Sequence, residues 1–165
     1  MQFDRIFRHL LEPHWWALRV FPMAARQAIE QAITASEQRH QAELRFVVEA
    51  GMPLRALLRD QSARQRAIEL FARLGIWDTE HNSGVLIYVQ LIDRRVEIVA
   101  DRGISARVGE AFWSSVCRRM ESEFAAGRFE NGALVALGDI TTALAEHFPA
   151  IGINPDELAN APLIL

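Results

Sequence analysis

Hydrophobic residues recur at helical spacing over residues 3–11, with charged residues between them. This spacing gathers the apolar side chains on one face and predicts a short amphipathic helix that ends before Pro13. The same spacing over about residues 22–41 predicts a long helix. Residues 1–21 are therefore expected to form an amphipathic N-terminal segment ahead of the main domain.

Three β-rich runs, at residues 44–49, 84–91 and 96–100, predict three strands. The second run is almost entirely apolar, as expected for a strand with both sheet faces covered. A helical pattern lies between the first two runs, with Asp60 as its expected N-cap and Gly75 at its end, and it favours a parallel connection. The short polar turn after the second run favours an antiparallel pair.

Helical spacing returns after the strands, over residues 104–124 and 131–148. Helices before, between and after the strands predict a sheet that is covered on both faces. The expected fold class is therefore α/β, a three-layer α/β/α sandwich with a small mixed central sheet flanked by about four helices. We expect the domain to span residues 22–149 and an irregular C-terminal tail to span residues 150–165.

The composition narrows the classes of function. The chain has 165 residues, which fits one domain, and a formal net charge of -3, so no nucleic-acid partner is expected. All 18 basic residues are arginines, which excludes a Schiff-base lysine and the lysine of a phosphate-binding loop. The single cysteine, Cys117, excludes an internal disulfide and a cysteine-based zinc cluster.

The sequence contains no apolar run of about 18 residues and no signal-peptide pattern at its start, so we expect no transmembrane segment. The predicted location is cytoplasmic, with a membrane-peripheral position as the alternative. That alternative rests on Trp15 and Trp16, which follow the first amphipathic helix, because aromatic residues suit a membrane interface. Packing of this segment against the domain or a partner is the competing interpretation.

The densest polar cluster, residues 78–84, lies immediately before the apolar strand. Its carboxylates Asp78 and Glu80 offer the oxygen ligands that Ca²⁺ and Mg²⁺ prefer. The alternative interpretation is structural: Asn82 hydrogen-bonds a turn, and Gly84 supplies backbone freedom at the entry to the strand.

A second polar cluster, residues 101–103, lies between the last strand and the next helix. Backbone N–H groups at the start of a helix favour anions, so an anion could dock beside Arg102. Asp101 together with Asp78 would form a carboxylate pair able to hold a metal ion that activates water. The competing explanation is that Asp101 caps the helix or a turn while Arg102 lies in solvent.

Three sequence blocks carry a family resemblance. H-N-S-G-V-L-I-Y-V at residues 81–89, D-R-R-V-E-I-V-A-D-R-G-I at residues 93–104 and G-R-F-E-N-G-A-L at residues 127–134 resemble the TPM domain, over about residues 22–148. The resemblance implies an α/β/α sandwich with a cleft near the loop before the long strand, where some relatives bind divalent cations. It also implies either phosphatase activity, which has been proposed for the family, or an accessory role for membrane complexes.

The resemblance assigns individual positions as well. Asn82 and Gly84 match the family's N-x-G before the strand, Arg94 or Arg95 matches its turn arginine, and Glu110 falls about where many relatives have aspartate. The candidates for the cleft or for ligand binding are Asn82, Gly84, Arg94, Arg102, Gly103 and Glu110, and the candidates for metal binding are Asp78, Glu80 and Asp101.

Two functions follow from these expectations. The first is a non-catalytic module that binds a divalent cation, Ca²⁺ or Mg²⁺, or another ligand, and serves membrane-protein assembly or maintenance through a membrane-associated protein partner. The alternative is a metal-dependent phosphatase, a phosphomonoester hydrolase in which Asp78 and Asp101 hold the cation and Arg102 receives the phosphate. The chain shows no recognisable general base or nucleophile, and its N-terminal segment is aromatic, which together favour the first function. Asp101 and Arg102 replace the family's usual glycine and aromatic residue, which counts against metal binding and phosphatase activity.

Overall fold

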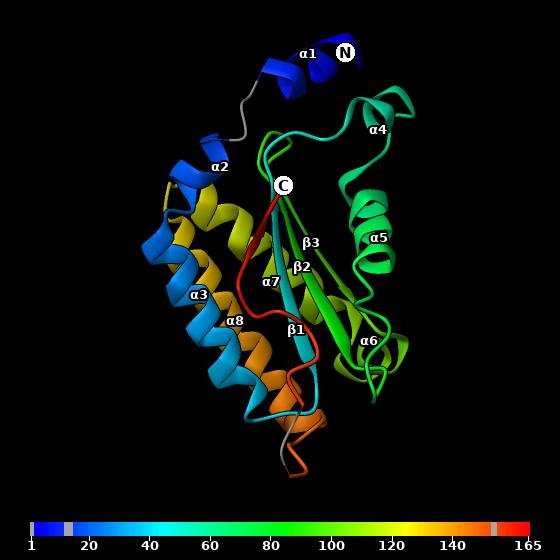
Figure 1. The fold of residues 1–165 in the computed structure, drawn as a ribbon, viewed down its shortest axis with the longest axis vertical. Helices are drawn as coiled ribbons and strands as arrows, with labels where there is room; N and C mark the ends of the chain where they lie inside the picture. Colours follow the sequence, from blue (N-terminus) through cyan, green and yellow to red (C-terminus); the bar gives the residue numbers. More distant parts are fainter. Residues whose placement is uncertain (1, 12–14, 153–154) are drawn as a thin grey trace.

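The computed structural model of the protein describes residues 2–11, 15–152 and 155–165 (Figure 1). Pro13, the predicted end of the first helix, lies outside these ranges. In chain order the elements are α1 (Gln2–Leu11), α2 (Trp15–Val20), α3 (Met23–Glu37), β1 (Glu43–Glu49), α4 (Leu54–Leu58), α5 (Ala63–Arg73), β2 (Gly84–Gln90), β3 (Arg95–Ala100), α6 (Arg102–Val108), α7 (Glu110–Ala125), α8 (Phe129–His147) and β4 (Leu163–Ile164).

The central sheet is mixed, with the strand order β3-β2-β1-β4. β1 and β2 run parallel, with Glu43 opposite Gly84 and Glu49 opposite Gln90. β2 and β3 run antiparallel and form the hairpin that the short polar turn predicts. The predicted α/β class and its mixed sheet are confirmed.

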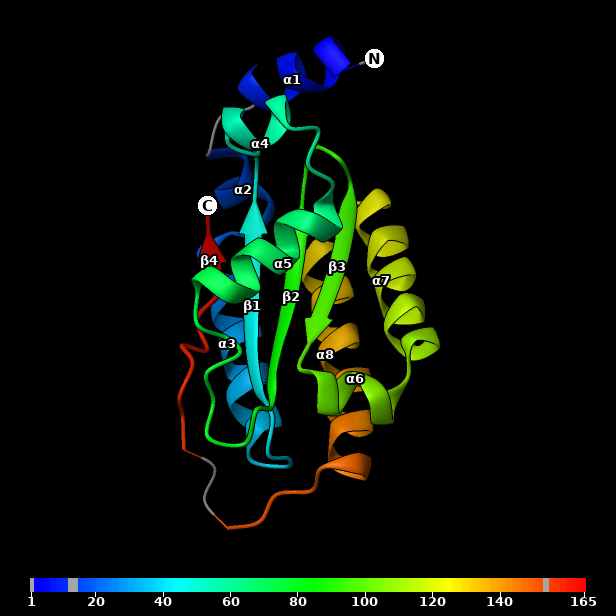
Figure 2. The same ribbon diagram turned by 90° about the vertical axis from the view of Figure 1, so that its right-hand side faces the viewer.

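Helices cover both faces of the sheet (Figures 1 and 2). α3, α7 and α8 pack on one face, where Phe46, Val48 and Ile87 belong to the larger hydrophobic core. α5 covers the other face, where Val47 and Tyr88 belong to a second core. The alternation along β1 produces this division, because successive residues of a strand point to opposite faces. The arrangement is the predicted three-layer sandwich.

The edge strand β4 is absent from the prediction. Leu163 and Ile164 pair in parallel with Val47 and Val48, so the end of the tail completes one edge of the sheet. The N–H of Leu165 continues the pairing by donating to the carbonyl oxygen of Val48 at 2.8 Å. A strand of 2 residues has no alternation to detect, which is why the sequence pattern predicts only an irregular tail.

Two of the differences from the predicted helix boundaries have a clear local cause. The helix predicted over residues 104–124 is two helices, α6 and α7, which meet at Gly109, where φ is 88°. This left-handed value suits glycine and interrupts the helix. The N-cap of α5 is Ser62 and not Asp60, because the Ser62 hydroxyl accepts from the Gln65 N–H at 3.2 Å and the Gln65 side chain accepts in return, forming a capping box.

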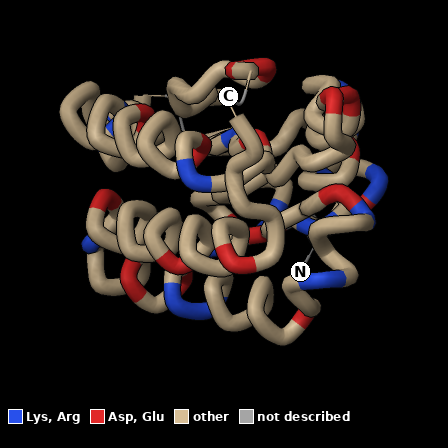
Figure 3. The backbone as a smooth tube through the Cα atoms, turned by 90° about the horizontal axis from the view of Figure 1, so that it is seen from below, with Lys and Arg blue, Asp and Glu red and all other residues tan. Residues whose placement is uncertain are grey.

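Charged residues of both signs are distributed over the molecule. Viewed along the long axis, arginines and acidic residues are interspersed on the helices (Figure 3). Within the described ranges, no helix combines the length and the apolar character that crossing a membrane requires.

Candidate functional site

The loop before β2 folds as a compact, hydrogen-bonded turn. Asn82 has a left-handed φ of 48°, and its N–H donates to the carbonyl oxygen of Thr79 at 3.0 Å. The Thr79 hydroxyl accepts from the Ser83 N–H at 2.8 Å. Gly84 lies so close to the preceding chain that a Cβ there would be 1.9 Å from the carbonyl oxygen of Ile76. Asn82 and Gly84 therefore shape the backbone at the entry to β2.

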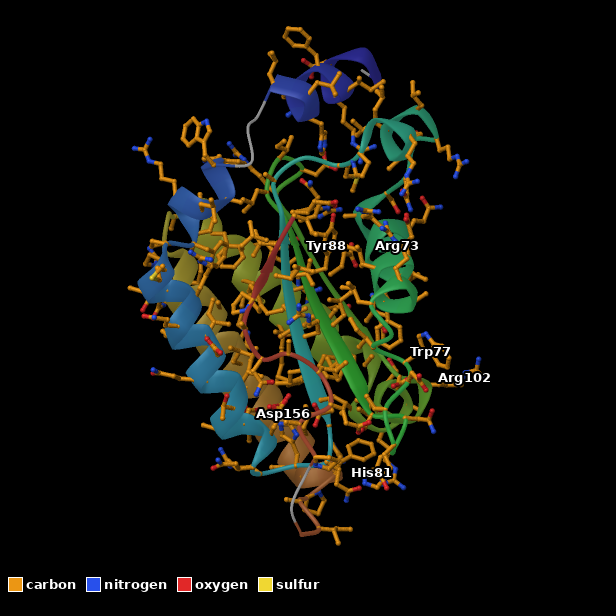
Figure 4. The ribbon with its side chains drawn as sticks, in the orientation of Figure 1. Arg73, Trp77, His81, Tyr88, Arg102 and Asp156 are labelled. Atoms are coloured by element: carbon orange, nitrogen blue, oxygen red, sulfur yellow. The ribbon has the colours of Figure 1, made fainter. Side chains whose placement is uncertain are left out.

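The second predicted loop meets the first through Asp101. Its carboxylate accepts from the Gly84 N–H at 2.7 Å and makes no capping hydrogen bond to α6. Burial raises the pKa of Asp101, and the hydrogen bond from Gly84 opposes that rise. Arg102 is exposed (Figure 4), and a Cβ at Gly103 would meet nothing within 4 Å. Asp101 thus joins the two loops by a bond to the backbone.

The remaining candidates are spread over both ends of the sheet. Asp78 and Glu80 are exposed. Among the described residues, the ligand atoms of Asp78, Glu80 and Asp101 do not all lie within 4.8 Å of one another. Arg94 lies in the β2–β3 turn, at the opposite end of β2 from the polar loop. Glu110 begins α7 and is exposed. Metal binding at the two polar loops stays a prediction.

A different acidic group gathers beside the start of β1. One carboxylate oxygen each from Glu37, Glu43 and Asp156 lie within 4.8 Å of one another, and we call these residues the carboxylate triad. Glu37 ends α3, Glu43 begins β1, and Asp156 lies in the C-terminal tail (Figure 4). The triad lines an open pocket of about 380 Å³ that Asn160 also lines. The first two carboxylates are buried, whereas Asp156 is exposed.

Backbone donors position the two buried carboxylates. Glu37 Oε1 accepts from the Leu44 N–H at 2.8 Å. Glu43 Oε2 accepts from the N–H groups of Glu157 and Leu158 at 3.1 and 3.2 Å. Glu43 therefore ties the C-terminal tail to the start of β1.

The environment of the triad changes its acidity. Burial raises the pKa of Glu37 to about 8, and the charges of Glu43 and Asp156 act in the same direction against the hydrogen bond from Leu44. Burial likewise raises the pKa of Glu43. Glu37 is therefore mostly protonated at neutral pH, because burial and, to a smaller extent, the neighbouring carboxylates disfavour its ionised form. A proton or a cation relieves this repulsion.

Comparisons with known proteins establish the family. The model of the TPM domain matches residues 18–143. The chain belongs to the TPM domain family. It is also similar to the NMR structure of the BA42 protein from the psychrophilic bacterium Bizionia argentinensis sp. nov., with a TM-score of 0.74, 28% sequence identity, and coverage of 85% of this chain and 92% of that chain. A search of curated proteins finds no match.

The family resemblance that the sequence blocks predict is thus confirmed, but the sequence pattern does not predict the carboxylate triad of this TPM domain. Glu37 has the pattern of a polar-face helix residue, Glu43 precedes an apolar strand, and Asp156 lies in a tail predicted to be irregular. Their separation along the chain conceals the convergence. Glu43 offers the one local signal, because a charged residue at the entry to a buried strand needs a partner of some kind.

The phosphatase alternative stays a prediction for this TPM domain. Asp101, a proposed metal ligand in that alternative, accepts a hydrogen bond from the backbone of Gly84. Arg102, the proposed phosphate ligand, is exposed. Burial raises the pKa of Cys117 to about 12, so this thiol is neutral at physiological pH and is a poor nucleophile.

Proposed function

We propose that this TPM-domain protein is a non-catalytic accessory module that binds a divalent cation, Ca²⁺ or Mg²⁺, and serves membrane-protein assembly or maintenance. The carboxylate triad would hold the cation. The observation that carries the proposal is the approach of three carboxylate oxygens within 4.8 Å, two of them on buried side chains. Donor sets made only of oxygen suit hard cations.

Asn160 adds a neutral oxygen to the same pocket. Its Oδ1 is buried and has no hydrogen-bond partner among the described residues. Its Nδ2 donates to the Thr34 hydroxyl at 3.1 Å, which fixes the side chain. Side-chain amide oxygens are common calcium ligands, so a cation in the pocket would give Oδ1 a partner.

Cation binding at the triad would join two parts of the chain. α3 and β1 supply Glu37 and Glu43, whereas the tail supplies Asp156 and Asn160 (Figure 4). A bound cation would therefore hold the tail, and β4 with it, against the edge of the sheet. In this proposal the cation holds the C-terminal tail in place, and the tail forms part of the surface that a partner would contact.

The proposal is tested by titrating the protein with Ca²⁺ and with Mg²⁺ while following amide NMR shifts and the heat of binding. We expect the shifts to cluster at residues 37–44 and 156–160. Glu37→Gln and Asp156→Asn should each weaken binding by about tenfold or more, because each removes an anionic ligand.

Asp78→Asn and Glu80→Gln are the matched controls, since both change exposed acidic residues of the polar loop and should leave binding unchanged. Shifts confined to residues 78–84 and 101–103 would move the site to the polar loops. The absence of heat and of shifts with either cation would refute cation binding.

The raised pKa of Glu37 supplies a further signature. A cation must displace the proton that Glu37 carries at neutral pH, so binding should release a proton and strengthen as the pH rises towards about 8. The release is measured from the dependence of the binding heat on the ionisation enthalpy of the buffer. Glu37→Gln should abolish this dependence; an unchanged dependence would exclude Glu37 as the group that loses the proton.

The accessory role is tested by removing α1. The deletion must spare α2, because Phe21 after it is buried and packs edge-on against Phe46, with ring centroids 6.0 Å apart. We expect a variant that lacks residues 1–12 to keep the circular dichroism of the intact protein and to lose capture of a membrane-protein partner. Full capture by this variant would contradict the role of α1.

A further inference from the structure

Three apolar residues of α1 point away from the domain. Phe7, Leu10 and Leu11 are 62%, 59% and 62% exposed. α4, which contacts α1 (Figures 1 and 2), exposes Leu54 and Leu58 at 48% and 65%. We call these five residues the apolar end face.

The polar face of α1 holds the helix on the domain. Arg5 donates to the Asp93 carboxylate at 2.7 Å. His9, which is buried, accepts at Nδ1 from the Met52 N–H at 3.0 Å, so Nε2 carries the proton that it donates to Asp93 at 3.0 Å. An amphipathic helix on a soluble domain usually buries its apolar face. In α1, Ile6 packs against the second core, but Phe7, Leu10 and Leu11 stay exposed and available to another surface.

Basic side chains accompany the apolar end face. Arg8 on α1, Arg55 on α4 and Arg59 directly after α4 are exposed, against the exposed acids Asp4 and Asp60. The chain as a whole carries a formal charge of -3, whereas the exposed charged residues named at this end include more arginines than acids. Its charge complements an anionic surface.

An open pocket of about 540 Å³ lies beside this face. Arg8 and Arg94 line it together with Trp16. Asp93 also lines the pocket, but its carboxylate is engaged by Arg5 and by His9. Arg8 also pairs with the exposed Asp4 at 3.3 Å, a surface contact that contributes little, so both arginines can offer donors to phosphate oxygens.

We propose that the apolar end face docks on an anionic lipid surface. Phe7, Leu10 and Leu11 would enter the acyl-chain boundary, while Arg8 and Arg94 meet lipid phosphates. Charge selects this occupant, because a leucine-rich and aromatic helix face flanked by arginines matches helices that lie in the interface of anionic membranes. The proposal goes beyond cation binding and does not depend on it.

The test is cosedimentation of the full chain with vesicles of mixed phosphatidylcholine and phosphatidylglycerol, in EDTA, so that failure of cation binding cannot affect the result. Binding should fall with added salt and should be weaker on phosphatidylcholine alone. The double variant Phe7→Ser, Leu11→Ser should bind at least about tenfold more weakly. Ile151→Ser, at a position 81% exposed beyond the far end of α8, is the matched control and should bind normally.

Two tryptophans give an independent readout. Trp15 and Trp77 are exposed to similar extents, 57% and 52%. Trp15 begins α2, the helix that follows α1 in the chain, whereas Trp77 lies before the polar loop (Figure 4). Vesicles should shift the fluorescence to the blue because Trp15 leaves water. The shift should disappear in Trp15→Phe and persist in Trp77→Phe.

Four outcomes would overturn the proposal. One is the absence of cosedimentation with mixed vesicles. A second is equal binding by the double variant once circular dichroism shows that it is folded. Another is a dimer that the double variant converts to a monomer without vesicle binding, which assigns the face to a second copy. The last is release by inorganic phosphate beyond the effect of sodium chloride at equal ionic strength, which assigns the arginines to free phosphate.

Discussion

Buried carboxylates stand at both ends of β1, and their charges are managed in opposite ways. Glu49, at the carboxyl end, receives the guanidinium of Arg66 at distances from 2.6 to 3.2 Å, and the Tyr88 hydroxyl donates to it at 2.6 Å. Glu43, at the other end, belongs to the carboxylate triad, where backbone N–H groups are donors and neighbouring carboxylates repel. The two groups lie far apart along the strand (Figure 4).

The difference separates a structural ion pair from a site that responds to its surroundings. An arginine of the chain itself pairs with Glu49, so the buried charge of Glu49 has its compensation built into the fold. The carboxylate triad concentrates like charges, so its protonation follows the pH, and under the proposed function it would also respond to cations. The predictions below test this contrast.

The largest effect is expected from Arg66→Met. This variant leaves Glu49 buried without its cation, which should lower the free energy of unfolding by about 3–5 kcal/mol. Urea denaturation provides the measurement. Arg73→Met is the control, because Arg73 is 54% exposed and pairs with Glu69 at the surface, so its loss should be about 0.5 kcal/mol or less. Equal losses in the two variants would remove the basis of the contrast.

The pH dependence of stability should report the carboxylate triad. The pKa of Glu37 is about 8 in the folded protein and 4.5 as its ordinary value. Its contribution is therefore fully present below about pH 4.5 and is lost as the pH rises through about 8, in total roughly 2–4 kcal/mol. Urea midpoints measured across this window should fall in the wild type and stay flatter in Glu37→Gln. Parallel curves would contradict the raised pKa.

Tyr88→Phe should have a moderate effect. The substitution keeps the ring but removes the hydroxyl that donates to Glu49 at 2.6 Å, which should cost about 1–3 kcal/mol. Burial raises the pKa of Tyr88, so the hydroxyl stays protonated and able to donate. The loss should be the same with and without Ca²⁺. A loss that depends on Ca²⁺ would connect the two ends of β1.

Asp156→Asn should have the smallest effect in EDTA, about 0.5 kcal/mol or less, because Asp156 is exposed. In Ca²⁺ the wild type should gain stability by mass action, and this variant should gain little of it. Thermal shifts with and without Ca²⁺ provide the measurement. A full calcium-dependent gain in Asp156→Asn would remove this residue from the site.

The fold was largely accessible from the sequence because its signals are local. The uninterrupted apolar run that forms β2 predicts a central strand, and the length of each connection predicts which neighbour is parallel and which is antiparallel. The prediction of Asp60 as the N-cap of α5 is wrong because two suitable capping residues, Asp60 and Ser62, lie close together in the sequence. Ser62 forms the reciprocal bonds with Gln65, whereas Asp60 adopts a φ of 49° in the preceding turn.

The candidate site was less accessible because it depends on contacts between distant segments. The polar loops before β2 and before α6 do meet, because the carboxylate of Asp101 accepts a hydrogen bond from the N–H of Gly84. The carboxylate triad, in contrast, requires the tail to return beside β1, which Glu43 secures through two N–H groups of the tail. No spacing within one segment encodes that return.

The composition of β2 affects how the protein is inactivated on heating. All 7 of its residues, Gly84–Gln90, are buried between β1 and β3, and none is charged. Such a segment is a template for intermolecular pairing once a neighbouring strand detaches. Heating should therefore end in aggregates, so the working lifetime of the protein at high temperature is set by the rate at which the sheet opens and not by an equilibrium free energy.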